Sequence, residues 1–223
     1  KQRAMTPILP ARLRRAGFLC GLILLLLLAL GSVFIGSRPI APSVTWQALW
    51  QVDGRNSEHL LVHYLRLPRA LLGLVVGIAL GAAGAVMQTL TRNPLADPGI
   101  LGVNAGATLA CVMAIAFLGL VDINQYIWFA LGGAALTGAA VCALGGLRGN
   151  SPVRMVLAGA ALSIVLLALT SLITVNSDEA IFDRFRHWAV GSLQGRGYDV
   201  LLPATLLVAL GIGLALLLAP ALD

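Results

Sequence analysis

The chain has 223 residues, of which 59% are hydrophobic and only 11% are charged, and its formal net charge is +6. A water-soluble domain of this length needs far more polar surface than this composition supplies. The basic residues are spread between apolar stretches instead of forming one patch, so nucleic acid is not an expected partner. We therefore expect an all-α integral membrane protein, folded as a polytopic helical bundle.

Six apolar intervals predict six transmembrane helices. Each is close to the roughly 20 residues that a helix needs to cross about 30 Å of hydrocarbon. None contains Asp, Glu, Lys, Arg or His, and the third is the shortest. The intervals are residues 16–35, 70–90, 105–121, 127–147, 155–175 and 200–222.

The basic residues before the first interval orient the chain. By the positive-inside rule they place the N-terminus in the cytoplasm. The interval itself is too long for a signal peptide, and no small-residue cleavage site follows it. The five basic residues are Lys1, Arg3, Arg12, Arg14 and Arg15.

Glycines recur every four residues in the second interval, at Gly73, Gly77 and Gly81. This spacing lets another helix backbone approach closely, so helix packing is the simplest interpretation. Gln88, near the inner end, is costly in lipid, so we expect it to hydrogen-bond to a neighbouring helix. A direct contact of Gln88 with a substrate is the alternative.

Two proline pairs follow the second interval. Asn93-Pro94 ends the helix, because a residue before proline avoids the helical region. Asp97-Pro98 places a capping side chain before a proline at the first helical position. Residues 93–99 are therefore predicted to form a rigid turn on the cytoplasmic side.

Arg66 and Arg69 flank Leu67-Pro68 at the outer end of the same interval. Arginine at a helix end often extends along apolar surface to reach the interface. Because proline fixes the local backbone, two guanidinium groups at a defined spacing could also bind carboxylates of an external partner. From the residues alone, both interpretations remain open.

Hydroxyl side chains form a stripe on the fifth interval. Ser163, Thr170 and Thr174 fall within about 40° of each other on a helix of 3.6 residues per turn. Such a stripe either lines a polar pathway or hydrogen-bonds backbone carbonyls and neighbouring helices.

Catalytic chemistry has little support in the sequence. The three histidines lack the spacing of a metal site, and no phosphate-binding loop of the GxxxxGK[ST] type is present. We expect no catalytic residues, no metal site and no cofactor bound by this chain.

Five motifs in order carry a resemblance. They are RLPR (residues 66–69), GAVMQTLTRNPLADPG (84–99), LGVNAGA (101–107), SPVRMVLAGAALS (151–163) and RHWAVGSL (186–193). Together they resemble the permease family of bacterial ABC importers for ferric siderophores, haem and vitamin B12. The ferric-enterobactin-type permeases are the most similar branch.

The resemblance implies a ten-helix permease of the bacterial inner membrane, of which residues 1–223 look like a single domain with the first six helices. It implies a second permease subunit (identical or related), a cytoplasmic ATPase dimer that uses Mg-ATP, and a periplasmic or lipid-anchored binding protein. Residues matching Arg66 and Arg69 would receive acidic side chains of that binding protein. The helix 155–175 would border the central pathway, and the helices that grip the ATPase would follow Asp223.

The function implied is ATP-driven import of a ferric siderophore. Haem or cobalamin import is the alternative within the family. A secondary transporter without an ATPase is a competitor from another class, although the predicted spans lack the ionisable groups that proton coupling needs. A membrane-bound enzyme is disfavoured because no catalytic cluster is present.

Overall fold

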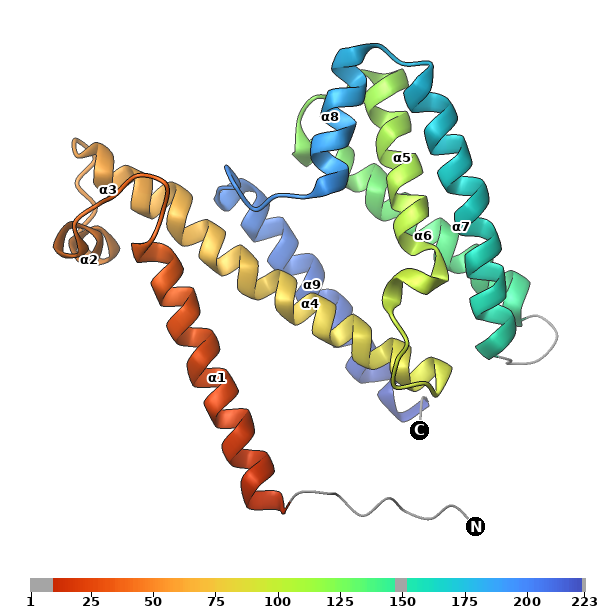
Figure 1. Ribbon diagram of the computed structural model, residues 1–223, viewed down its shortest axis with the longest axis horizontal. Helices are drawn as coiled ribbons and strands as arrows, with labels where there is room; N and C mark the ends of the chain where they lie inside the picture. The colour runs from red at the N-terminus through yellow and green to blue at the C-terminus, as the bar shows by residue number, and fades with distance from the viewer. Residues whose placement is uncertain (1–9, 147–151, 222–223) are drawn as a thin grey trace. The chain divides into compact units, whose positions relative to one another are not determined.

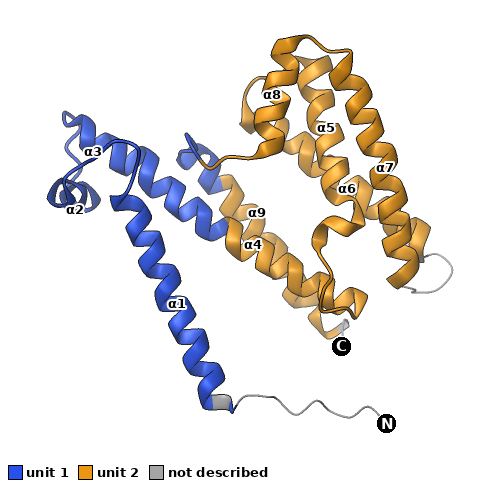
Figure 2. Cartoon of the chain, in the orientation of Figure 1, with its two compact units in different colours: residues 1–75, 194–202 blue, residues 76–193, 203–223 orange. Residues whose placement is uncertain are grey.

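The computed structural model describes residues 10–146 and 152–221, and every regular element in that part of the chain is a helix (Figure 1). The chain divides into two compact units, residues 1–75 with 194–202 and residues 76–193 with 203–223 (Figure 2). In chain order the α-helices are α1 (Ala11–Phe34), α2 (Pro42–Trp50), α3 (Ser57–Leu61), α4 (Leu67–Thr91), α5 (Val103–Leu118), α6 (Ile123–Gly146), α7 (Pro152–Val175), α8 (Glu179–Val190) and α9 (Tyr198–Leu218). The shorter elements are a π-helix, η1 (Val62–Arg66), and the 3-10 helices η2 (Pro98–Leu101) and η3 (Ala219–Ala221).

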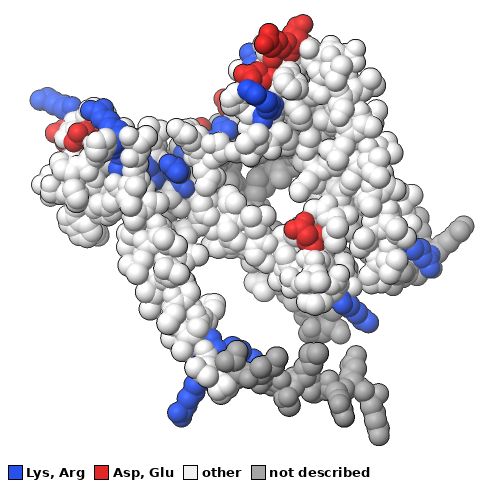
Figure 3. Space-filling model, viewed as in Figure 1, with Lys and Arg blue, Asp and Glu red and all other residues white. Residues whose placement is uncertain are grey.

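Within the described residues, five helical stretches are long and apolar enough to cross a membrane: Arg12–Phe34, Ser57–Thr91, Ile123–Gly145, Pro152–Val175 and Tyr198–Leu218. The interval 105–121 falls short, because α5 has 16 residues and a length of about 24 Å. Lys1, Arg3 and the last residues of two intervals, 147 and 222, lie outside the described residues. On the face shown in Figure 3, charged side chains gather at helix ends, at loops and on the short helix α8, and they leave the shafts of the long helices uncharged.

The first unit packs α1, α2, α3 and η1 around a small apolar core of Val33, Ile40, Ala48 and Val62. Asn56 caps α3, since its side-chain oxygen accepts a hydrogen bond from the Glu58 amide at 2.9 Å. His59 is buried, and its Nδ1 accepts a hydrogen bond from the Asp53 amide at 3.2 Å. This histidine therefore holds the loop between α2 and α3.

The π-helix η1 joins α3 to α4 in one continuous helical stretch. The Leu67 amide donates to the Val62 carbonyl, five residues earlier. Pro68 follows at once, is fully buried and has no amide to donate. Its ring would clash with the carbonyl four residues earlier in a regular α-helix, and the wider π-turn relieves that clash.

The second unit is built on close packing of α5, α6 and α7. A Cβ at Gly106 of α5 would lie 2.6 Å from the Gly133 carbonyl of α6, so the two backbones touch there. Gly159 of α7 meets η2 in the same way, because its Cβ would lie 2.6 Å from the Ile100 carbonyl. Small residues therefore set the distances between these helices.

Two segments rich in aromatic residues form the short helices α2 and α8. Trp46 and Trp50 of α2 are exposed and meet edge to face, with ring centroids 5.8 Å apart. On α8, Phe185 and Trp188 stack with ring centroids 6.3 Å apart, and Trp188 packs against the core around Cys111. The aromatic face of α8 thus partly covers the protein core.

Candidate functional site

Arg66 points into the protein. Its side chain is only 7% exposed, and one guanidinium nitrogen donates to the carbonyls of Val33 at 3.2 Å and Phe34 at 3.0 Å. The other terminal nitrogen donates to the Arg38 carbonyl. Carbonyls at a helix C-terminus lack intrahelical partners and carry partial negative charge, so a cation is well placed there.

Gly36 makes room for this contact. A Cβ at Gly36 would lie 2.8 Å from the guanidinium carbon of Arg66. Docking of a binding protein at Arg66 therefore stays a prediction, and the structure shows a different contact for this side chain. Its donors are engaged with the end of α1 and the loop after it, and the side chain acts as a structural clamp.

Arg69 differs from Arg66 although only three residues separate them. Its side chain is exposed, and within the described residues it makes no hydrogen bond or ion pair. Arg69 is thus the member of the pair that is free to meet an external carboxylate.

Three glycines of α4 have no close partner in the described part of the chain. A Cβ at Gly77, Gly81 or Gly84 would meet no atom within 4 Å, and Gly73 is half-buried. Gln88 is exposed, and no hydrogen bond from its side chain is found among the described residues. Close helix packing at these glycines and a hydrogen bond from Gln88 to a neighbouring helix therefore stay predictions.

The turn after α4 has the geometry that its proline pairs predict. The helix ends at Thr91, and the Asn93 side chain accepts a hydrogen bond from the Leu95 amide across Pro94 at 3.0 Å. Asp97 accepts from the Gly99 amide at 2.6 Å and precedes Pro98, the first residue of η2. The element that Asp97 caps is a 3-10 helix instead of an α-helix.

The hydroxyl stripe on α7 bonds to its own helix. Ser163 donates to the Gly159 carbonyl at 2.7 Å, and Thr170 donates to the Leu166 carbonyl at 2.9 Å. Thr174 donates to the Thr170 carbonyl at 3.0 Å. Thr170 and Thr174 are buried, which fits the local alternative, and a role in a transport pathway remains a prediction.

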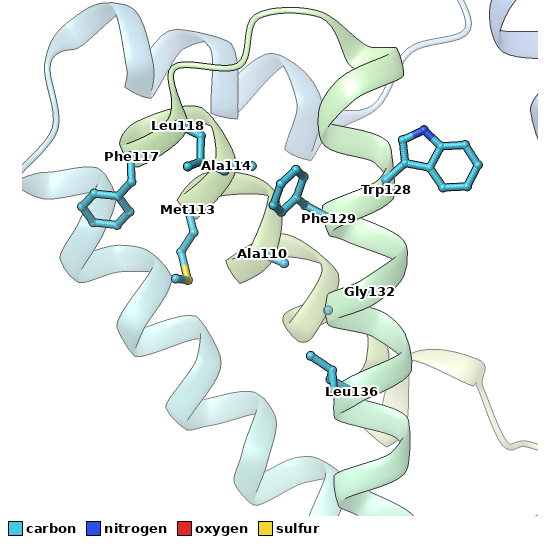
Figure 4. Close-up of a pocket in the computed structure, with 10 residues that line it drawn as sticks. Ala110, Met113, Ala114, Phe117, Leu118, Trp128, Phe129, Gly132 and Leu136 are labelled. Carbon is cyan, nitrogen blue, oxygen red and sulfur yellow. The ribbon is translucent and has the colours of Figure 1, made fainter.

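An apolar groove of about 580 Å³ lies on the α5–α6 pair (Figure 4). Met113 and Phe117 of α5 line one side, and Phe129 and Leu136 of α6 line the other. Trp128 points away from α5 (Figure 4). The lining residues are apolar. Among them, Trp128 alone has a side-chain hydrogen-bond donor, its indole N–H.

Three aromatic residues of the first unit meet in a cluster that sequence reasoning missed. They are His63, Tyr64 and Tyr198, the last at the start of α9. The histidine was considered only as a metal ligand, and no group of three or more metal-ligating side chains is found in the described residues. The available signal was Pro68 inside a helical pattern, which indicates irregular backbone just before it.

The chain matches the FecCD transport family over residues 23–223. It is 42% identical to the ferric enterobactin transport system permease protein FepD of Escherichia coli, over 91% of this chain and 61% of that protein. It is 41% identical to the probable siderophore transport system permease protein YfiZ of Bacillus subtilis, over 82% of this chain and 55% of that protein. The chain thus spans about three-fifths of the length of these relatives.

A solved ABC transporter of the metal-chelate type, in an inward-facing conformation, has a similar fold. Its TM-score is 0.71 at 29% identity, with 93% of this chain and 63% of that chain covered. The five helices of membrane-spanning length found in the described part of the chain agree with that helical architecture. The chain is therefore a multi-pass membrane protein and belongs to the FecCD transport family.

Proposed function

We propose that the chain is a permease subunit of an ATP-driven importer that moves a ferric siderophore across the bacterial inner membrane. The observation that carries this proposal is the 42% identity to a ferric enterobactin permease over 91% of the chain. Relatives named for siderophore, ferric citrate and ferric hydroxamate transport point to the same substrate class. Haem is the second candidate, because a hemin permease of Yersinia pestis is 35% identical over 86% of the chain.

The complete transporter would contain a second permease subunit, two ATPase subunits that use Mg-ATP, and an external binding protein. The permease itself would bind no cofactor, and its N-terminus would lie in the cytoplasm. Outward and inward access would then alternate as ATP binding and hydrolysis shift the populations of two conformations. Ser163, Thr170 and Thr174 are candidates for lining the route between them.

Arg69 would be the docking residue of this chain. It is exposed and unpaired in the described residues, whereas Arg66 is buried and engaged with three carbonyls. A carboxylate of the binding protein could form two parallel hydrogen bonds with the free guanidinium. Because the contact is exposed, its strength should fall as salt concentration rises.

Charge reversal at Arg69 tests the docking role in the full-length transporter. Arg69→Glu should weaken binding-protein docking about tenfold at physiological salt, because it replaces an attraction by a repulsion. Arg92→Glu is the matched control: Arg92 is also exposed and lies just past the opposite end of α4. Equal docking by Arg69→Glu and the wild type would remove Arg69 from the interface.

Uptake of iron-55 tests the function itself. Membrane vesicles that contain the full-length protein, its ATPase and its binding protein should accumulate iron from a ferric siderophore only when ATP is supplied. Uptake that persists without ATP would favour a secondary transporter, and uptake of haem alone would favour the haem alternative.

A further inference from the structure

His63, Tyr64 and Tyr198 form an array of aromatic rings in the first unit, called here the aromatic triad. The His63 and Tyr64 ring centroids lie 5.0 Å apart at an interplanar angle of 81°. Tyr198 lies 5.9 Å from the His63 ring and 6.4 Å from the Tyr64 ring, nearly perpendicular to the latter at 88°. Edge-to-face contacts of this kind are favourable and hold the rings in fixed orientations.

The backbone that carries two residues of the aromatic triad is not a regular α-helix. His63 and Tyr64 lie in the π-helix η1, and π-helical turns are frequent at functional sites. Because Pro68 has no amide, the Tyr64 carbonyl lacks its usual helical donor. A Cβ at Gly197 would lie 3.8 Å from that carbonyl, so the segment before α9 approaches η1 closely and brings Tyr198 into place.

Two polar side-chain groups of the aromatic triad make no hydrogen bond in the described residues. The Nδ1 atom of His63 is buried without a hydrogen bond, and it is the only such side-chain atom in the described residues. Buried polar atoms are normally paired, so an unpaired one calls for an explanation. Tyr64 is 53% exposed, and no hydrogen bond to its hydroxyl group is found in the described part of the chain.

The sequence segments that contain the aromatic triad carry an excess of positive charge. The segments of the first unit that we place outside the membrane, residues 36–69 and 194–199, contain five arginines and three acidic residues. One of these arginines, Arg196, precedes Tyr198 by two positions. An excess of positive charge attracts anionic ligands and repels cationic ones.

We infer that the aromatic triad is a contact site for an anionic ferric chelate with aromatic, catecholate-type arms. This inference rests on the proposed function and narrows its substrate class. A catechol ring can stack on the exposed Tyr64 ring, and its oxygen atoms can accept hydrogen bonds from the tyrosine hydroxyl groups. Ferric citrate and ferric trihydroxamates have no aromatic ring in their iron-binding groups, so they gain nothing from such a site.

The aromatic triad would bind the chelate weakly and release it again. Only one ring, that of Tyr64, is largely open to solvent, so the chelate gains a single stacking contact. Transport requires binding that is favourable enough for entry and weak enough for release. The aromatic triad would thus help the chelate move from the binding protein into the transporter, and selection would be shared with the binding protein.

The test compares the uptake of two iron-55 chelates, ferric enterobactin and a ferric trihydroxamate, by vesicles that contain the full-length transporter and its binding protein. The wild type should take up ferric enterobactin, and Tyr64→Leu should lower this uptake about threefold to tenfold, the size expected for a lost stacking contact. Tyr64→Phe keeps the ring and should retain most uptake. Trp50→Leu is the matched control, because it removes an exposed aromatic side chain of the same unit outside the aromatic triad.

ATP hydrolysis stimulated by the binding protein reports whether each variant still assembles, and uptake is normalised to the amount of transporter. A loss of uptake by Tyr64→Leu with intact ATP hydrolysis supports the inference. The inference alone is overturned if the wild type takes up only the trihydroxamate, if Tyr64→Leu leaves enterobactin uptake unchanged, or if Trp50→Leu or impaired assembly produces the same loss. If the wild type takes up no ferric siderophore, the proposed function is refuted and the inference with it.

Discussion

The crossing of α5 and α6 and the junction at Arg66 show two different ways to hold helices in an apolar chain. At the crossing, Gly106 and Gly133 bring two backbones into contact because neither has a side chain. At the junction, one long charged side chain fills the space between helices and donates to the carbonyls of Val33, Phe34 and Arg38. The first contact depends on side chains that are absent, and the second depends on one that is present.

The difference follows from the physics of the membrane. Lipid tails are as apolar as leucine, so apolar side chains alone do little to draw helices together, and close van der Waals contact must do so. Polar backbone atoms at a helix end, by contrast, need hydrogen-bond donors. A crossing between helix shafts therefore suits glycine, whereas the end of α1 suits arginine.

The largest effect should come from adding one methyl group at the α5–α6 crossing. A Cβ at Gly133 would lie 2.4 Å from the Gly106 carbonyl oxygen and 2.5 Å from the Ala110 side chain. Gly133→Ala should therefore cost about 2 kcal/mol or more of stability through overpacking, measured as a lower thermal midpoint of the full-length protein in detergent.

Gly132→Ala is the matched control for this change. Gly132 is the adjacent residue on α6, but a Cβ there would meet no atom within 4 Å in the described residues. Alanine is also the better helix former, so Gly132→Ala should be neutral or stabilise by up to about 1 kcal/mol. Equal thermal midpoints for Gly132→Ala and Gly133→Ala would mean that the backbones do not touch at this crossing.

A second, smaller effect should come from removing the Arg66 clamp. Arg66→Met keeps much of the side-chain volume but leaves three carbonyls without their donor, which should cost about 1–3 kcal/mol. Arg69→Met removes the same charge from an exposed position and should change stability by less than about 0.5 kcal/mol. The thermal midpoints of the two variants give the comparison, and equal losses would contradict an inward-facing Arg66.

The effect of a substitution at Gly36 should depend on Arg66, which makes this comparison sharper. Gly36→Ala should destabilise the wild type, since the new Cβ would lie 2.8 Å from the guanidinium carbon. In the Arg66→Met variant the same change should cost less, so the two changes should be non-additive in a double-mutant cycle. Additive losses would show that Gly36 and Arg66 act independently.

Apart from the control variants, the smallest effect on stability is expected at Thr170. Thr170→Val keeps the shape of the side chain and removes only the hydrogen bond to the Leu166 carbonyl, so stability should change by about 0.5–1.5 kcal/mol or less. A pathway role predicts, in addition, that uptake per assembled transporter falls severalfold. Normal uptake by Thr170→Val would leave the hydroxyl group with its local role only.

The long helices could be predicted from the sequence because their cause is local. The interval 155–175 corresponds to α7, Pro152–Val175, and the interval 16–35 corresponds to α1, Ala11–Phe34. An uncharged apolar run of this length predicts a transmembrane helix without any knowledge of tertiary contacts. The cap at Asp97 could also be predicted, because the residues that form it are close together in the sequence.

The tertiary contacts could not be predicted in the same way. Spacing alone identified the glycines of α4, yet the close contacts found within the described chain occur at other glycines, among them Gly106, Gly133 and Gly159. A glycine pattern shows where a helix can approach, but not whether one does. Likewise, nothing local shows that Arg66 turns toward α1 and Arg69 away, because their directions depend on the end of another helix.

The shortness of α5 has a consequence for what surrounds its N-terminus. A helix of about 24 Å is about 6 Å shorter than the hydrocarbon layer, so non-helical backbone must lie at hydrophobic depth or the bilayer must thin locally. Non-helical backbone is tolerated at that depth only where protein or a water-filled cavity covers it. The packing of Gly159 against Ile100 and Leu101 supplies such a cover for the segment that leads into α5.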